Sequence, residues 1–182
     1  MPPSNAILSR AEHAFLAAAR RATLATTARD GRARLVPICF VLAETRDEPP
    51  GPVLYTALDE KPKRTPDPHG LGRVRDIERN AAVSVLVDRW DEDWSHLAWL
   101  RCDGQAGLID PGSAAAEREM AIAALRAKYP QYAGHALEER PLIRVAIERA
   151  VGWGDLSDRG TRRSPSDGGS GSSSSPGDIR RR

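Results

Sequence analysis

Six segments of this chain alternate apolar and polar residues with the period of a β-strand, and this pattern constrains the fold more than any other feature. A doubly wound parallel sheet needs regular alternation of strands and helices, and only one such unit is present. The expected strands cover residues 22–27, 32–43, 53–57, 82–88, 97–109 and 142–153. The pattern therefore predicts an α+β fold, in which an antiparallel β-barrel carries helices at its periphery.

A turn motif, a proline and the apolar pattern indicate how the expected strands are connected and where they lie in the sheet. Asp30-Gly31 supplies the positive φ of a tight turn, which predicts a hairpin between the first two strands. Pro37 has no N–H to donate to a neighbouring strand, so we expect an edge segment or a bulge within residues 32–43. Apolar side chains fall on both faces of residues 82–88, which predicts a strand buried on both faces.

Three helices are expected beside the strands. Ser9 and Glu12 have the spacing of a capping box, which predicts a first helix that ends near Arg21. A second helix crosses from the third strand to the fourth, and the third covers residues 111–128 with Ser113 as its N-cap. Residues 158–182 are almost free of apolar side chains, so we expect a folded domain of residues 1–157 and a disordered tail.

Charge and cysteine content exclude several classes of protein. The chain has a net charge of +2, but the tail alone holds six arginines and three aspartates, so residues 1–157 are close to neutral and nucleic-acid binding is not expected. Cys39 and Cys102 lie in apolar segments and are expected to be reduced core residues. No segment approaches the length of a membrane span and no signal peptide is recognisable, which predicts a cytoplasmic protein that is not bound to a membrane.

A basic segment follows the third expected strand. Lys61, Lys63 and Arg64 come just after the strand, and the next helix carries Arg73. Thr56 adds a hydroxyl, and Gly70 is expected to offer free backbone N–H groups at the start of the helix. Cations of this kind suit a phosphate group. The alternative is a solvated charged loop, because residues 59–79 contain six basic and five acidic residues.

A second segment of interest, residues 88–99, contains three tryptophans, three aspartates and one glutamate. Flat aromatic side chains can wall a pocket for a heterocycle, whereas the alternative is a loop that the tryptophans anchor. The carboxylates could be metal ligands or general bases, but we interpret them as solvated, since no cation-binding loop accompanies them. His69, close to the basic segment, is the histidine that merits a test, and no motif of hydrolytic or nucleoside-triphosphate chemistry is present. The chain therefore suits a protein whose bound cofactor supplies the reactivity.

Several of these segments carry a resemblance to a known family. Residues 61–65 (KPKRT), 73–94 (RVRDIERNAAVSVLVDRWDEDW), 97–106 (LAWLRCDGQA) and the opening hairpin at 24–42 resemble the pyridoxamine 5′-phosphate oxidase-like split-barrel superfamily. The similarity covers residues 8–156 and is greatest to a branch of F420-dependent enzymes of actinobacteria. The resemblance implies a six-stranded antiparallel split β-barrel, the FMN-binding split barrel, and a homodimer with two cofactor sites at its interface.

The resemblance also implies roles for individual residues. Lys61, Lys63, Arg64 and Arg73 would hold the cofactor phosphate, Thr56 and Ala57 would lie beside the ring system, and Trp153 would come from the second protomer. The Arg-Leu-x-Pro ending of true pyridoxamine phosphate oxidases is missing, because the last strand ends in Gly152-Trp153-Gly154-Asp155-Leu156. Oxidation of vitamin B6 is therefore not expected.

These features together predict an oxidoreductase that transfers hydride between reduced coenzyme F420 and a small organic substrate. One alternative keeps the fold and replaces coenzyme F420 with FMN. Another is a carrier or sensor that binds a flavin or haem without turnover. A third treats the arginine-rich tail as a tether for an acidic partner.

Overall fold

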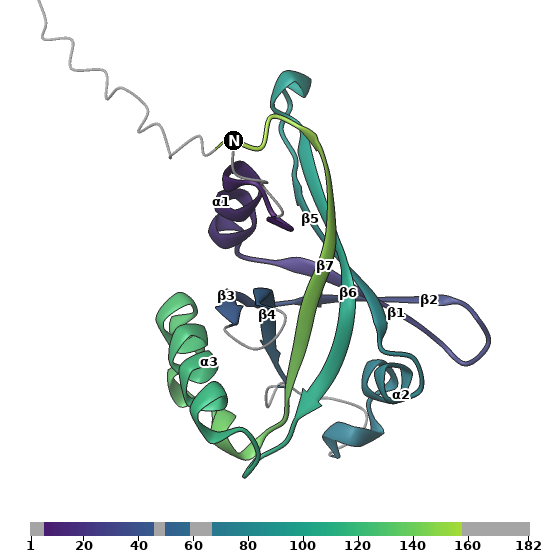
Figure 1. The fold of residues 1–182 in the computed structure, drawn as a ribbon, viewed down its shortest axis with the longest axis vertical. Coiled ribbons are helices and arrows are strands. Elements are labelled where there is room, and N and C mark those ends of the chain that lie inside the picture. Colours follow the sequence, from purple (N-terminus) through teal and green to yellow (C-terminus); the bar gives the residue numbers. More distant parts are fainter. Residues whose placement is uncertain (1–5, 46–49, 59–66, 158–182) are drawn as a thin grey trace, which may run out of the picture.

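The structure, a computed structural model, describes residues 6–45, 50–58 and 67–157, and a single antiparallel sheet organises this part of the chain (Figure 1). The strands lie in the order β2-β1-β5-β6-β7-β4-β3 across the sheet. The strands are β1 (Ala22–Thr27), β2 (Ala33–Ile38), β3 (Val41–Thr45), β4 (Gly51–Ala57), β5 (Ala82–Arg89), β6 (Ala98–Ile109) and β7 (Leu142–Gly154). The α-helices are α1 (Arg10–Ala18), α2 (Gly72–Arg79) and α3 (Ala115–Lys128). The expected α+β split barrel with peripheral helices is confirmed.

One expected strand is divided, so the described sheet has seven strands rather than six. The segment 32–43 forms β2 and β3, which are separated at Cys39 and Phe40. The reason is a tyrosine: the Tyr129 hydroxyl accepts a hydrogen bond from the Phe40 N–H (3.0 Å) and donates one to the Phe40 carbonyl (2.9 Å). These bonds replace those of a neighbouring strand. The chain thus passes from one edge of the sheet to the other in two residues, and the sheet is not closed.

Proline and glycine lie where their chemistry requires. Pro37 is part of β2, which pairs with β1 alone, so its missing N–H faces away from the ladder at an edge of the sheet. The hairpin is confirmed, because Thr27 pairs with Ala33 and Gly31 between them has a φ of 83°.

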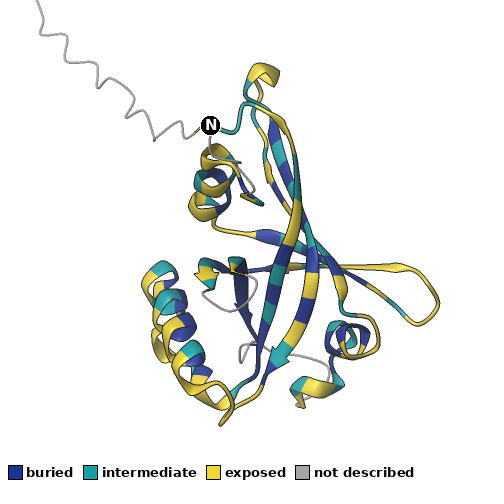
Figure 2. Cartoon of the chain, in the orientation of Figure 1, coloured by how far each residue is buried: buried dark blue, intermediate teal, exposed yellow. Residues whose placement is uncertain are grey.

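Strand β5 is buried on one face only, so the expectation of burial on both faces is wrong. Val83, Val85 and Val87 are buried, whereas Leu86 on the opposite face is 39% exposed. The same alternation continues across β6 and β7 (Figure 2). In the described part of the chain no helix covers the outward face of β5, which carries Leu86.

The interior consists of two apolar clusters that share β4. Leu54 belongs to the cluster that includes Leu16 of α1, and Tyr55 belongs to the cluster that includes Leu125 of α3. Strand β4 is buried on both faces because it lies between these clusters. Both cysteines carry free thiols, and burial raises the pKa of Cys102 to about 12.

The helix ends agree only in part with those predicted from the sequence. The capping box of α1 is confirmed, since Ser9 and Glu12 exchange hydrogen bonds of 2.8 and 3.3 Å. Ser113 does not cap α3, because its hydroxyl donates to the Asp110 carbonyl (2.7 Å) and Ala114 occupies the N-cap position. None of the helices in the described ranges is long and apolar enough to cross a membrane.

Candidate cofactor site

The ends of three strands meet at one end of the barrel. In neighbouring pairs, Ala57 of β4 lies opposite Leu142 of β7, which in turn lies opposite Ile109 of β6. Leu58 continues β4 with a hydrogen bond from its N–H to the Pro141 carbonyl (3.2 Å). Helices α2 and α3 flank this end of the sheet (Figure 1).

Thr56 and Ala57 form part of the wall at this end. Both residues are buried, at 3% and 7% exposure. The alternation along β4 directs Thr56 to the same face as Leu54, and Ala57 belongs to the cluster beneath α3. Both side chains therefore pack into the interior at this end of the barrel.

Three of the expected phosphate ligands lie outside the described residues. Lys61, Lys63 and Arg64 fall within residues 59–66. The described chain leaves β4 at Leu58 and resumes at Asp67, where the Asp67 side chain caps the short 3-10 helix η1 (Pro68–Gly70).

Arg73, the fourth expected ligand, is half-buried in the first turn of α2. The expectation for Gly70 is wrong: its N–H donates to the Asp67 carbonyl (3.1 Å), and α2 begins only at Gly72. Leu71 is the N-cap, and no side chain caps this end of α2. Arg73 therefore lies closer to the start of the helix than the sequence indicated.

A buried aspartate fixes α2 to the barrel. Asp76 Oδ2 accepts hydrogen bonds from Thr26 Oγ1 of β1 (2.9 Å) and Arg34 Nε of β2 (2.6 Å), and Asp76 Oδ1 lies 3.4 Å from Arg79 Nη2. Burial favours the neutral acid, but these hydrogen bonds outweigh burial and lower the pKa of Asp76. A Cβ atom at Gly72 would lie 2.6 Å from the Arg34 guanidinium, so α2 begins directly against this network.

The Asp76 network was not predicted from the sequence. Arg34 and Asp76 are 42 residues apart, so no local spacing connects them. A weaker signal was available: Asp76 lies between Val74 and Ile77 on the apolar stripe of a basic helix, where an acidic residue needs a partner.

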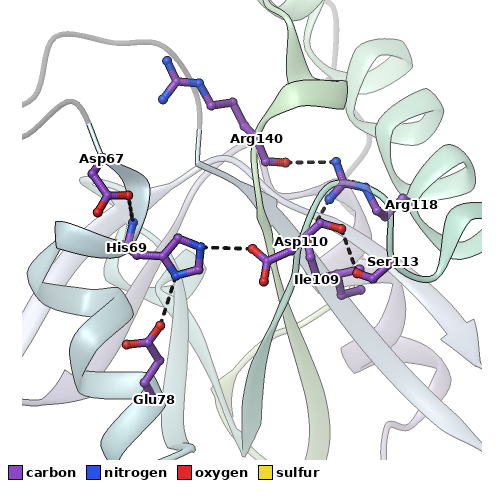
Figure 3. Close-up of polar contacts among 8 residues, drawn as sticks. All are labelled: Asp67, His69, Glu78, Ile109, Asp110, Ser113, Arg118 and Arg140. Atoms are coloured by element: carbon purple, nitrogen blue, oxygen red, sulfur yellow. Dashed lines mark hydrogen bonds and ion pairs between the residues drawn. The ribbon is translucent and has the colours of Figure 1, made fainter.

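His69 connects η1 with two other elements (Figure 3). Its Nδ1 lies 3.1 Å from Glu78 Oε1 of α2, and its Nε2 lies 3.1 Å from Asp110 Oδ1, in the residue that follows β6. The hydrogen bond with Glu78 is the largest cause that raises the pKa of His69.

A buried arginine packs on the other side of the end of β6. Arg118 of α3 donates to the carbonyls of Ile109, Leu137 and Arg140, at 2.6, 3.4 and 3.0 Å. Figure 3 shows it beside Asp110, with the Arg140 side chain directed away from His69. Arg118 thus fixes backbone groups and is part of the support of the site.

Trp153 lies at the other end of the molecule. Leu142 is the first residue of β7 and Trp153 is its second-to-last, so their separation along the strand is about 35 Å at roughly 3.3 Å per residue. Trp153 pairs with Trp99 and is 54% exposed. The structure of one chain therefore does not bring Trp153 together with Thr56, Ala57 and Arg73.

The remaining tryptophans of interest are also at that far end. Trp90 and Trp94, near the β5–β6 connection, are 71% and 74% exposed, so they do not anchor the loop. Asp91 lies 3.2 Å from His96 Nδ1, and Asp93 caps the 3-10 helix η2 (Trp94–His96). These two carboxylates thus have structural partners.

The whole described fold matches one family. The model of the pyridoxamine 5′-phosphate oxidase family matches residues 8–154. The chain belongs to the pyridoxamine 5′-phosphate oxidase family. Members of this family are generally flavin-binding oxidoreductases. Among curated proteins, none matches this chain.

Solved structures have the same fold at low sequence identity. A conserved hypothetical protein from Mycobacterium tuberculosis matches 90% of this chain and 96% of its own, with 17% identity and a TM-score of 0.60. A FAD-binding protein from Mesorhizobium loti matches 80% and 94%, with 23% identity and a TM-score of 0.56. A putative pyridoxamine 5′-phosphate oxidase from Listeria innocua matches 76% and 91%, with 18% identity and a TM-score of 0.51. At these identities the likeness concerns the fold.

Proposed function

We propose that this member of the family is an oxidoreductase that binds the phosphate of a flavin-type cofactor at the barrel end where β4, α2 and the end of β6 meet. Lys61, Lys63, Arg64 and Arg73 would hold the anionic part, and Thr56 and Ala57 would lie beside the ring. The cofactor supplies the hydride chemistry when it is bound, and the barrel supplies position and exclusion of water.

One observation supports this proposal: the described acids of the basic segment take part in hydrogen bonds that hold η1 and α2 in place. Asp67 caps η1, Asp76 bonds Arg34 and Thr26, and Glu78 bonds His69. These are the three described acids among the five of residues 59–79. In a solvated loop the acids would serve only to neutralise nearby bases, whereas here Asp76 also bonds Thr26 and Arg34 of the barrel, and Arg79 is the base of the same segment that it faces, at 3.4 Å. This arrangement suits an anionic ligand.

A second protomer would complete the site. Trp153 lies about 35 Å along β7 from Leu142, so it can reach a cofactor at the barrel end only from another copy of the chain. We therefore propose a homodimer that acts in the cytoplasm on a small-molecule substrate. The outward sheet face with Leu35 (64% exposed) and Leu86 offers the apolar surface that an interface between two copies needs.

Coenzyme F420 is the cofactor that we favour, and FMN is the alternative. The resemblance of residues 61–106 to F420-dependent enzymes supports the first. The flavin-binding character of the family, and the FAD-binding protein of Mesorhizobium loti with the same fold, support a flavin. Both candidates present a phosphate group and a flat ring system to the same corner of the barrel.

Thermal unfolding with each candidate tests the assignment. A ligand that binds only the native state raises the melting temperature. We expect a shift with coenzyme F420 and a smaller one with FMN, and none with haem or pyridoxal phosphate. Oxidation of the reduced cofactor by added acceptors then distinguishes an enzyme from a carrier, because a carrier binds but does not turn over. A shift with haem alone, or no shift with either flavin-type cofactor, would exclude the proposal.

A further inference from the structure

His69 forms a bridge between two parts of the barrel end. The Nδ1 atom faces Glu78 on α2 and the Nε2 atom faces Asp110 after β6, each at 3.1 Å. The backbone N–H of His69 donates to Asp67 Oδ1 at 3.0 Å, which fixes the residue within η1. We call these contacts the His69 bridge.

The two carboxylates indicate which form of the ring the bridge requires. A carboxylate accepts hydrogen bonds, and a neutral imidazole has only one N–H, so one of its nitrogens would present a lone pair to a carboxylate oxygen. The imidazolium satisfies both contacts. The charged groups that face the ring are Glu78 from α2 and Asp110 from the turn before α3, while the Arg140 guanidinium points away (Figure 3).

We infer that His69 is a positioning residue for the proposed cofactor site, and that its protonated ring ties η1 and α2 to the end of β6. Asp76 fixes α2 to β1 and β2, and the His69 bridge adds the attachment to β6. Arg73 lies in the first turn of α2, which follows His69 closely in the chain. This inference rests on the proposed function, because it concerns the same site.

The sign of the pH effect follows from the bridge. The pKa of His69 is raised by the hydrogen bond with Glu78 and by Asp110, so the attachment is complete below the pKa of an unperturbed histidine, about 6.5. It weakens as the pH rises through the raised pKa of the folded protein. Cofactor affinity should therefore fall with rising pH. The phosphate of FMN ionises further near pH ~6 and acts in the opposite direction, so a variant without the ring is needed as a reference.

The test compares His69→Gln with the matched variant His96→Gln in the full chain. His96 also lies between two aspartates, Asp91 at 3.2 Å and Asp93 at 3.6 Å, but at the opposite end of the sheet. The dissociation constant of FMN is measured at pH ~6 and ~9. Between these two pH values, the affinity of the wild type and of His96→Gln should fall about 3- to 10-fold more than the affinity of His69→Gln. The reason is that only these two proteins lose the two partly exposed ion pairs of His69 as its ring loses the proton. An equal pH dependence in all three proteins overturns the inference.

Two measurements on the ligand-free wild type keep the inference separate from the proposed function. The His69 ring should titrate above pH ~6.5 by nuclear magnetic resonance, and amide exchange protection of residues 69–79 should fall as the ring loses its proton. A ring that titrates at or below that value, or unchanged protection, refutes the bridge even where FMN binds. If FMN binds none of the proteins, the proposed function fails, and these measurements still decide the bridge. They also decide it if His69→Gln does not fold.

Discussion

Single residues decide whether the basic segment of this protein is a binding site or ordinary surface. Three of its acids, Asp67, Asp76 and Glu78, bond η1, Arg34 and His69, and Asp76 also lies 3.4 Å from Arg79. Charge counting along the sequence could not reveal this, because it treats every acid as a partner of the nearest base. The hydrogen bonds of the described acids support the proposal that this segment binds an anion.

Lys61→Ala combined with Lys63→Ala should raise the cofactor Kd roughly 10- to 100-fold, because each change would remove one of the charged hydrogen bonds to phosphate that we propose, with partial compensation. Titration with coenzyme F420 and with FMN measures the change. Arg29→Ala with Arg32→Ala removes the same charge from the exposed β1–β2 hairpin, outside the proposed site, and should leave the Kd unchanged. Equal affinity in both double variants would show that Lys61 and Lys63 are not ligands.

Asp76→Asn should lower the free energy of unfolding at pH 7 by about 2–3 kcal/mol, because the change removes the charge that Arg34 and Thr26 share. Because the pKa of Asp76 is lowered in the folded state, its contribution is present above the unfolded value of about 3.9 and is lost as the pH falls through the folded pKa. Urea denaturation at pH 7 and at pH ~3 should show a smaller loss on acidification in Asp76→Asn than in the wild type. Asp30→Asn, in the exposed hairpin, is the control. A variant with full wild-type stability at pH 7 would contradict the structural role of Asp76.

At the scale of elements, the crossing from β2 to β3 depends on a contact from Tyr129, the residue that ends α3. Tyr129→Phe should cost about 1–3 kcal/mol of unfolding free energy, because it leaves the backbone N–H and carbonyl of the buried Phe40 without the Tyr129 hydroxyl. Ser113→Ala removes a hydroxyl hydrogen bond at an exposed position and should cost much less. Chemical denaturation compares the two. Equal effects would mean that Tyr129 does not hold the crossing.

Local chemistry explains which elements the sequence could predict. The Ser9 capping box, the Asp30-Gly31 hairpin and the strand alternation each depend on neighbours in the chain, and the structure confirms them. The division at Phe40 could not be predicted, since Tyr129 lies 89 residues away. For the same reason the His69 bridge and the Asp76 network were missed. Burial on both faces of β5 was predicted because apolar side chains fall on both faces, and this was wrong because Leu86 faces outward.

At the scale of the whole molecule, the proposed homodimer makes a prediction about mass. Leu86→Asp should convert a two-chain particle into single chains and weaken cofactor binding, because a carboxylate would be buried in the proposed interface. Met120→Asp changes an exposed apolar residue (42%) on α3 and should leave the dimer intact. Sedimentation and cofactor titration measure both properties. A wild type that sediments as one chain, or a Leu86→Asp protein that stays dimeric, would contradict this arrangement.

The shared strand β4 has a consequence for how this molecule responds to heat and to ligands. Leu54 belongs to one apolar cluster and Tyr55 to the other. If either cluster unfolds, the other loses the side chains that β4 contributes to it, so the two clusters should unfold together. The described chain should behave as one cooperative unit. A small molecule bound at the end of β4 would then stabilise the whole described chain against unfolding, from the first helix to the last.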